Sequence, residues 1–327
     1  MDINEIARRA GVSRTTVSRY LNNGYVSQEK RELISRIIEE TGYVPSRRAQ
    51  QLRTGKSGLV GVVIPKINSQ SVGRMVAGIT DVLSQRNYQV VLANTNNDEN
   101  TEVQYLELFG GRNHVDGIIL IATVLTHEHY RAIRKLRVPC VMLGQHVPDF
   151  PSVYQDDYRA VRDLTSLALR KGSQPAYLGV FERDVAAGRE RHRGFLDACA
   201  EAGITPLPQA QLVVDFNADA GYFGAERLLD TVPQLDTIIC ATDDIAFGAM
   251  MCMSEYGIHV PEDVQVTGIG DSLLSRIARP SLSTAHLHYR TSGQEAARLL
   301  LERVDQRPNT KTELRMGYEV YARNSMR

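Results

Sequence analysis

From Leu59 onward the chain alternates short apolar segments with amphipathic ones, and this alternation constrains its fold more than any other feature. Apolar runs of this length, each followed by a helical pattern, predict parallel strands that are covered on both faces. The predicted strands are Leu59–Ile64, Gln89–Leu92, Gly117–Ile121, Cys140–Leu143, Ala176–Val180, Leu212–Val214, Thr237–Cys240 and Val264–Gly268. Helical patterns between them include Val72–Gln85, Arg159–Arg170, Glu190–Ala202 and Ile245–Tyr256. Eight strands with a break near 150–158 predict two doubly wound units, with a ligand cleft at the carboxyl ends of their strands.

The first 45 residues show a different pattern, that of three short helices. We expect helices from Asn4 to Ala10, from Arg14 to Leu21, and from Ser27 up to a stop at Gly42. Gly11 supplies the positive φ of a sharp turn, and Ser13 is placed to cap the second helix. The predicted core face of the third helix consists of Leu33, Ile34, Ile37 and Ile38.

The stretch IARRAGVSRTTVSRYLNNGYVS predicts a helix-turn-helix. This motif needs a small residue where the helices meet, a glycine turn and apolar anchors behind the second helix. Ala7, Gly11, Val12, Val17 and Leu21 meet these demands. Arg14 and Thr15 are the first exposed side chains, placed to read base edges, while Ser13, Thr16, Ser18 and Asn22 are placed to contact phosphates. The alternative is a three-helix subdomain with a basic surface.

Charge is unevenly distributed, although the whole chain has a formal net charge of zero. Residues 1–56 hold 11 Lys and Arg against 6 Asp and Glu, whereas the remainder holds 27 against 32. Residues 43–58 are polar and basic: Pro45 fixes the start, residues 47–53 are expected to form a short helix, and residues 54–58 are expected to be a linker. A basic head on an acidic body suits a partner that presents negative charge at one end only.

Several function classes are disfavoured by what the sequence lacks. A length of 327 residues suggests two or three domains, and the chain has no apolar run of the roughly 18 residues that cross a bilayer. We expect a cytoplasmic protein with four reduced, buried cysteines, since no signal peptide and no Cys/His metal spacing is present. His286 and His288 lack a third nearby ligand, so we expect no metal. No phosphate-binding loop, dinucleotide fingerprint or nucleophile elbow is present, so neither an enzyme nor a cofactor is expected.

Five segments carry a family resemblance: GVSRTTVSRYLN, SRRAQQLRTGKSGLVGVVIP, VDGIIL, CATDDIAFGAM and VPEDVQVTGIGDS. With them, over essentially its whole length, the sequence resembles the lactose-repressor-type (LacI/GalR) family of bacterial transcription regulators, and within it the sucrose- and trehalose-type repressors. The resemblance implies a helix-turn-helix head and a periplasmic-binding-protein-like α/β core of two doubly wound parallel-sheet subdomains. The implied division is a head at 1–45, a hinge helix and linker at 46–58, an N-subdomain at 59–156 plus 287–316, and a C-subdomain at 157–286 plus 317–327.

The resemblance also implies how DNA is bound. Arg14 and Thr15 would read bases in the major groove, and Leu52 would enter the minor groove from a hinge helix that forms only on DNA. An apolar wedge of this kind unstacks a base step and kinks the duplex. The alternative is that Leu52 packs onto the core. The expected DNA contacts are Ser13, Arg14, Thr15, Thr16, Ser18, Arg19, Asn22, Tyr25, Ser27, Arg48, Ala49 and Leu52.

By the same resemblance the cleft binds a small effector. The expected contacts are Lys66, Gln145, Arg191, Phe216, Thr242 and Asp271. Arg191 matches the arginine that grips the ligand, Phe216 the aromatic ring that stacks on a sugar, and Lys66 a basic residue that binds a phosphate. Each has an ordinary alternative: a surface ion pair for Arg191, core packing for Phe216 and a solvated amine for Lys66. Gly270 replaces an Asp of the family pattern, and Asp243 is an alternative cap for the helix after Thr242.

Together these features predict a homodimeric repressor of a sugar-utilisation operon, with no leucine heptads after the core to make a tetramer. Its expected partners are roughly palindromic double-stranded operator DNA and a small sugar, either sucrose, fructose or a phosphorylated sugar. The alternative is control by a phosphoprotein co-regulator or by a non-sugar corepressor. We expect the protein to be associated with the bacterial nucleoid when it is bound to its operator.

Overall fold

The computed structural model describes residues 2–21, 24–43, 56–111, 114–306 and 313–327. The chain divides into two compact units, Met1–Gly58 and Leu59–Arg327. No helix in these ranges combines the length and the apolarity that spanning a membrane requires.

The described residues of the first unit form three helices: α1 (Ile3–Arg9), α2 (Arg14–Leu21) and α3 (Gln28–Thr41). Their turns form as expected, because Gly11 and Gly42 both adopt positive φ, at 57° and 59°. Ile6, Val17 and Ile34 are completely buried and form the centre of this small core.

Leu33 does not belong to that core, contrary to the sequence prediction. Its side chain is 37% exposed, whereas its neighbour Ile34 is fully buried. One step along a helix turns the side chain by about 100°, so the stripe formed by Ile34 and Ile37 leaves Leu33 at the edge.

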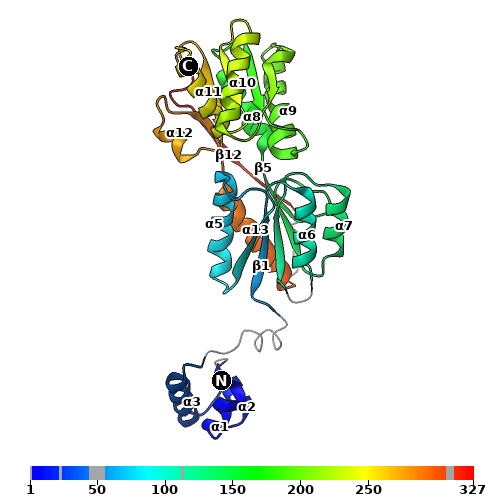
Figure 1. Cartoon of the computed structure of the whole chain (residues 1–327), viewed down its shortest axis with the longest axis vertical. Coiled ribbons are helices and arrows are strands. Elements are labelled where there is room, and N and C mark those ends of the chain that lie inside the picture. The colour runs from blue at the N-terminus through cyan, green and yellow to red at the C-terminus, as the bar shows by residue number, and fades with distance from the viewer. Residues whose placement is uncertain (1, 22–23, 44–55, 112–113, 307–312) are drawn as a thin grey trace. The chain divides into compact units, whose positions relative to one another are not determined.

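The second unit contains two six-stranded sheets, each with helices on both faces (Figure 1). We call the part built on the first sheet the N-lobe. Its strand order is β11-β5-β4-β3-β1-β2, all parallel, with β11 (Glu313–Met316), β5 (Ser152–Gln155), β4 (Cys140–Gly144), β3 (Gly117–Ile121), β1 (Leu59–Ile64) and β2 (Gln89–Asn94). Its helices are α5 (Gln70–Ser84), α6 (Glu99–Phe109), α7 (His127–Lys135) and α13 (Tyr289–Val304).

The part built on the second sheet is the C-lobe. Its strand order is β12-β10-β9-β8-β6-β7, with β12 (Tyr318–Tyr321), β10 (Ser283–Leu287), β9 (Gln265–Ile269), β8 (Thr237–Cys240), β6 (Pro175–Gly179) and β7 (Gln211–Val213). Its strands are parallel except for β12, which runs antiparallel to β10. Its helices are α8 (Asp157–Ala168), a π-helical segment (Val185–Glu190), α9 (Arg191–Glu201), a short 3-10 turn (Pro208–Ala210), α10 (Ala218–Thr231), α11 (Asp243–Glu255) and α12 (Leu273–Ile277).

Strand β1 shows why the sheets are covered on both faces. Val62 pairs in register with Leu92 of β2 and Ile119 of β3, and its side chain packs in the cluster formed with α5 and α13. The next residue, Val63, points to the opposite face and packs in the cluster formed with α6 and α7. The apolar run therefore has no polar side, which confirms the predicted doubly wound α/β class.

The chain passes between the lobes three times, each time through one residue: residue 156 between β5 and α8, residue 288 between β10 and α13, and residue 317 between β11 and β12.

Sequence patterns did not identify β5, β10, β11 or β12. β11 alternates exposed and partly buried residues, β12 places the exposed Glu319 among partly buried residues, and β5 and β10 begin with a serine. The predicted break near 150–158 thus contains β5, and the first crossing follows it.

Helices α5 and α13 approach so closely that only glycine fits between them. A Cβ on Gly78 of α5 would lie 1.9 Å from the carbonyl oxygen of Arg290, and a Cβ on Gly293 of α13 would lie 2.1 Å from that of Met75. Backbone atoms cannot move aside as a flexible side chain can. These two glycines therefore fix the distance between the helices that cover one face of the N-lobe sheet.

We expect Gly78→Ala to lower the free energy of unfolding of the core by about 1–3 kcal/mol, because the added methyl group overpacks the α5–α13 contact. Gly73→Ala is the matched control, since the same helix has open space at that position. It should raise stability by about 0.5–1 kcal/mol through helix propensity. Urea denaturation of the full chain measures both, and equal effects of the two substitutions would contradict the packing argument.

Candidate nucleic-acid interface and interlobe cleft

The N-terminal end of α2 presents the predicted base-reading side chains to solvent. Ser13 Oγ accepts a hydrogen bond from the backbone N–H of Thr16 at 3.1 Å, so this end of the helix is capped as expected. Arg14 and Thr15 are exposed, whereas Val17 is fully buried against the other helices. The buried anchor fixes the helix, and the capped end holds two polar side chains outward, as reading a groove requires.

The other predicted DNA contacts differ in their surroundings. Thr16 and Ser18 are partly buried, Arg19 and Ser27 are exposed, and Tyr25 is 91% exposed. Asn22, Arg48, Ala49 and Leu52 lie outside the described residues. Ser27 is the N-cap residue of α3, but its side chain makes no capping hydrogen bond to that helix.

A cavity of about 450 Å³ lies between the two lobes. Its walls come from the carboxyl ends of parallel strands in both sheets, namely β1, β3 and β4 of the N-lobe and β8 and β9 of the C-lobe. This is the place where ligands bind in doubly wound sheets. Four of the six predicted effector contacts line it: Lys66, Arg191, Phe216 and Thr242.

Lys66 and Phe216 face each other across this cleft. The Lys66 ammonium lies 5.8 Å from the centre of the Phe216 ring, which in turn meets Phe181 edge to face with centroids 5.8 Å apart. Phe216 is partly buried against the C-lobe core, and the rest of its surface borders the cavity. The cleft thus has an aromatic wall with a cation above it.

Arg191 lies at the bottom of the cleft and is only 5% exposed. Its guanidinium donates to the Asp157 carboxylate at 2.8 Å from Nε and lies 2.7 Å from it at Nη2, donates to the Ala241 carbonyl at 2.5 Å, and reaches the Tyr289 hydroxyl at 3.3 Å. Burial lowers the pKa of Arg191, but the Asp157 charge outweighs it, so the group stays protonated. Arginine has five N–H donors, so these bonds leave one for a ligand.

Thr242, rather than Asp243, caps helix α11. The Thr242 hydroxyl accepts from the Ile245 N–H at 3.2 Å. The buried Asp243 carboxylate instead accepts from the Ser272 N–H at 2.7 Å and from the Thr284 hydroxyl at 2.6 Å. These bonds hold the ends of β8, β9 and β10 together beneath the cavity.

Gly270, the departure from the family pattern, has a structural reason. Its φ is +139°, and a Cβ there would lie 3.5 Å from an Asp243 carboxylate oxygen. Its carbonyl oxygen accepts a hydrogen bond of 2.7 Å from Arg74 of α5, which crosses the cleft. An Asp at this position would be strained and would place a second carboxylate beside Asp243.

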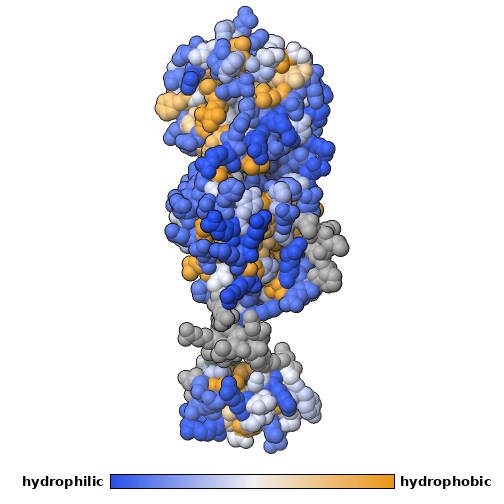
Figure 2. Space-filling model, turned by 90° about the vertical axis from the view of Figure 1, so that its right-hand side faces the viewer, coloured by the Kyte–Doolittle hydropathy of each residue, from blue (hydrophilic) through white to orange (hydrophobic). Residues whose placement is uncertain are grey.

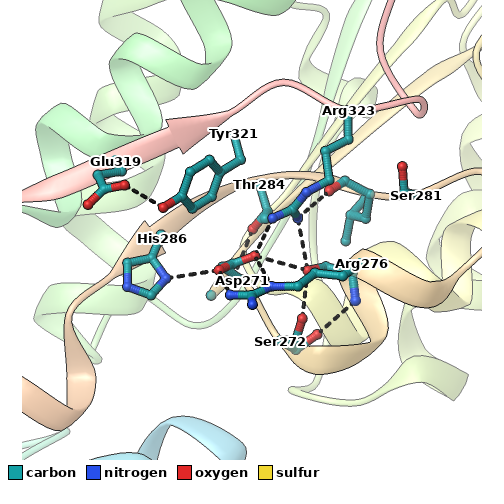
Figure 3. A network of polar contacts seen from close by, with 12 residues as sticks. Asp271, Ser272, Arg276, Ser281, Thr284, His286, Glu319, Tyr321 and Arg323 are labelled. Atoms are coloured by element: carbon teal, nitrogen blue, oxygen red, sulfur yellow. Dashed lines mark hydrogen bonds and ion pairs between the residues drawn. The ribbon is translucent and has the colours of Figure 1, made fainter.

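Asp271 lies away from the cavity, contrary to the expectation for an effector contact. Its fully buried carboxylate is 2.5 Å from both Arg276 and Arg323 and 3.0 Å from His286 (Figure 3). Burial alone raises the pKa of Asp271, but the two guanidinium groups outweigh burial and hold that pKa well below its usual value. The Asp271 carboxylate is therefore bound by side chains of the C-lobe and does not face the cleft.

Gln145 also lies outside the cleft. Its side-chain amide donates to the Thr123 carbonyl at 3.0 Å, and the residue lines a neighbouring cavity. Four groups that sequence analysis did not identify line the cleft instead: Arg74, Asp157, Asp184 and Tyr289. Arg74 stacks over the Tyr289 ring at 4.9 Å. Only Asp184 follows a predicted strand, Ala176–Val180, whereas Asp157 and Tyr289 follow β5 and β10, which sequence patterns did not identify.

No group of three or more metal-ligating side chains occurs in the ranges that the structure describes. His286 and His288 are stacked edge to face, with ring centroids 4.9 Å apart, and His286 is held by Asp271.

Asp184 is a buried carboxyl group at the cleft. It caps the π-helical segment by accepting the Ala187 N–H at 2.9 Å. Burial raises its pKa from 3.8 to about 6, although that hydrogen bond opposes the rise. Between about pH 4 and pH 6 the folded chain therefore keeps a proton on Asp184 that the unfolded chain releases. This group stabilises the fold at low pH, and that contribution is lost as the pH rises through about 6.

We therefore expect Asp184→Asn to gain stability relative to the parent as the pH rises from about 4 to about 7. The amide keeps the capping oxygen and never ionises, so the difference between variant and parent should grow by about 1–3 kcal/mol. Thermal unfolding over this pH range measures it. A difference that does not change with pH would show that Asp184 does not titrate there.

Comparison with known proteins places the chain in a family. Residues 2–46 match the bacterial regulatory proteins of the lacI family, and residues 167–326 match the periplasmic binding protein-like domain. The sucrose operon repressor of Staphylococcus xylosus is 33% identical over 296 residues, which cover 90% of this chain and 91% of that protein.

Two solved structures share the architecture. The transcriptional regulator CelR in complex with cellobiose has a TM-score of 0.77 and is 28% identical, with 99% of each chain covered. The lac repressor dimer bound to operator and an anti-inducer has a TM-score of 0.90, with 99% of this chain and 98% of that chain covered; its identity is 24%, so it supports the fold alone. The chain belongs to the lacI family of bacterial regulatory proteins, and it is a transcription regulator rather than an enzyme.

Proposed function

We propose that this protein represses a sugar-utilisation operon, that α2 reads the operator, and that a small sugar in the interlobe cleft controls this binding. The observation that carries the proposal is the cleft itself. Lys66 and Asn97 from the N-lobe and Phe216, Asn217 and Thr242 from the C-lobe line one cavity of about 450 Å³. A partly exposed ring surrounded by amide and hydroxyl groups matches a sugar, which has an apolar face and a polar rim.

Lys66 and Arg74 are the groups that would hold a phosphoryl group on the sugar, in a cavity that Asp157, Asp184, Asp243 and Asp244 also line. Lys66 and Arg74 both line the cavity, and Arg74 Nε is buried and has no hydrogen-bond partner among the residues that the structure describes. A buried donor without a partner is costly, and an anionic oxygen would satisfy it. Fructose, sucrose and trehalose and their phosphates are the ligands to compare. The relative from Staphylococcus xylosus is named for sucrose.

In this proposal the sugar controls DNA binding by changing the arrangement of the two lobes. A sugar that contacts both lobes stabilises the arrangement in which their walls are close, and operator binding favours one arrangement of the lobes. The segment 46–58 joins the lobes to the head, and in this proposal it forms the hinge helix whose Leu52 enters the minor groove. The protein would act in the bacterial cytoplasm, at the nucleoid when bound to its operator.

A second copy of the chain completes the proposal. A two-fold operator requires two heads at a fixed spacing. Helix α12 offers a surface for the partner, because Leu273, Leu274 and Ile277 are 71%, 47% and 57% exposed. Three large apolar side chains on one five-residue helix suit burial against another copy.

We expect Arg14→Ala to weaken binding to a DNA site selected by the full chain from a random pool by roughly 10- to 100-fold, as loss of a bidentate base contact does. Arg36→Ala removes the same charge from the exposed face of α3 and is the matched control. Fluorescence anisotropy with the selected site and with a scrambled duplex separates specific from non-specific loss. An equal loss for the two variants would contradict base reading by Arg14.

We expect Phe216→Ala to abolish the thermal shift that the best-binding sugar produces, because the stacking wall of the cleft is lost. Phe223→Ala is the control, since Phe223 is 65% exposed on α10 and lies outside the cleft. The screen compares sucrose, fructose, trehalose and their phosphates. If none of them shifts the unfolding midpoint of the parent protein, the proposed sugar control is wrong, and control by a protein or a non-sugar corepressor is favoured.

A further inference from the structure

A second and larger cavity, of about 670 Å³, lies beside the cleft at the junction of the lobes. It shares Gly144, Gln155, Asp157 and Ala186 with the cleft. Its other walls come from the loop after β4, from the start of α8 and from the segment between β6 and α9. Figure 2 views the core from the side that carries α7 and α9, and hydrophilic residues cover most of this side.

Arginines dominate the charge of this cavity. Five of them line it, Arg159, Arg183, Arg189, Arg193 and Arg315, against the carboxylates of Asp156, Asp157 and Glu190. Asp157 is already neutralised by the buried Arg191, which does not line this cavity.

The remaining ion pairs leave a surplus of positive charge. Asp156 lies 3.6 Å from Arg159 and 3.5 Å from Arg315, so one carboxylate serves two guanidinium groups. Arg193 pairs with Glu190 at 2.7 Å, and Arg183 pairs with Glu99 of the N-lobe at 2.7 Å.

Arg189 is exposed and forms no ion pair within the part of the chain that the structure describes. Asp156 balances one of the two arginines that it contacts, Arg159 and Arg315. Together with Arg189, this leaves two guanidinium charges in the cavity without a counter-charge among the described residues.

We propose that this cavity is a second binding site, which takes a small phosphorylated metabolite. Guanidinium groups fork onto phosphate oxygens, and a dianionic phosphoryl group would balance the surplus on Arg159, Arg189 and Arg315. Tyr154 and Tyr158 also line the cavity, and Arg193 stacks over the Tyr158 ring at 4.3 Å. They offer an apolar surface for the rest of the molecule.

The site is built from both lobes, which gives its ligand a means of control. Arg315 belongs to β11 of the N-lobe, whereas Arg159 and Arg189 belong to the C-lobe. Asp157 lines this cavity and also holds Arg191 at the bottom of the cleft. A metabolite here therefore acts on the same lobe junction as the sugar, from a separate position.

The test uses the full chain and inorganic pyrophosphate as the probe, in isothermal titration at near-physiological salt. We expect Arg189→Ala and Arg315→Ala each to weaken pyrophosphate binding about tenfold or more. Arg227→Ala is the matched control, because it removes an exposed arginine from α10 that lines neither cavity. Its affinity for pyrophosphate should equal that of the parent.

Two further measurements separate this site from the cleft and from simple attraction of anions. Phe216→Ala should lose its sugar response and keep its pyrophosphate affinity, so the two proposals fail independently. Arg189 has no ion pair in the described structure, so its replacement tests the site even if Arg315→Ala fails to fold. Unchanged binding by Arg189→Ala, an equal loss for Arg227→Ala, or citrate binding as tight as that of pyrophosphate would each overturn the proposal.

Discussion

A buried ion pair between Arg191 and Asp157 joins the first residues of helices α9 and α8 at the base of the cleft. Asp157 is the first residue of α8, directly after the chain first crosses between the lobes, and Tyr289 is the first residue of α13, directly after the second crossing. Arg191 bonds both of them and the carbonyl of Ala241. Loss of one partner of such a pair leaves an uncompensated buried charge and costs about 3–5 kcal/mol. The ion pair itself lies within the C-lobe, and Arg191 reaches the N-lobe through its 3.3 Å hydrogen bond to the Tyr289 hydroxyl.

Further contacts also join the two lobes across the cleft. Arg74 reaches the Gly270 carbonyl at 2.7 Å, and Arg183 pairs with Glu99 at 2.7 Å. Both join the lobes without a ligand; the first is a partly buried hydrogen bond, and the second is an exposed ion pair of a kind that contributes little. A sugar that contacts both Lys66 and Phe216 would add contacts to both walls at once. It can shift the arrangement of the lobes only by as much as its affinity differs between the two arrangements.

Sequence patterns predicted the parts of this protein that depend on local chemistry. The strand Leu59–Ile64 was identified residue for residue because it is apolar on both faces, and the exposure of Arg14 follows from its place at a capped helix end. Positions that depend on distant partners were not predictable. Asp271 is held by Arg323, 52 residues away, and Asp184 has a raised pKa only because folding buries it. Neither environment leaves a trace in the neighbouring residues.

In the proposed function, ligand binding in the core changes DNA binding by the head. The most direct measurement is the affinity of the full chain for its selected operator, by fluorescence anisotropy at constant salt, with and without a saturating concentration of the sugar that binds best. We expect a change of at least about fivefold, the lower end of ordinary allosteric coupling. An operator affinity that stays the same while the sugar demonstrably occupies the cleft would contradict it.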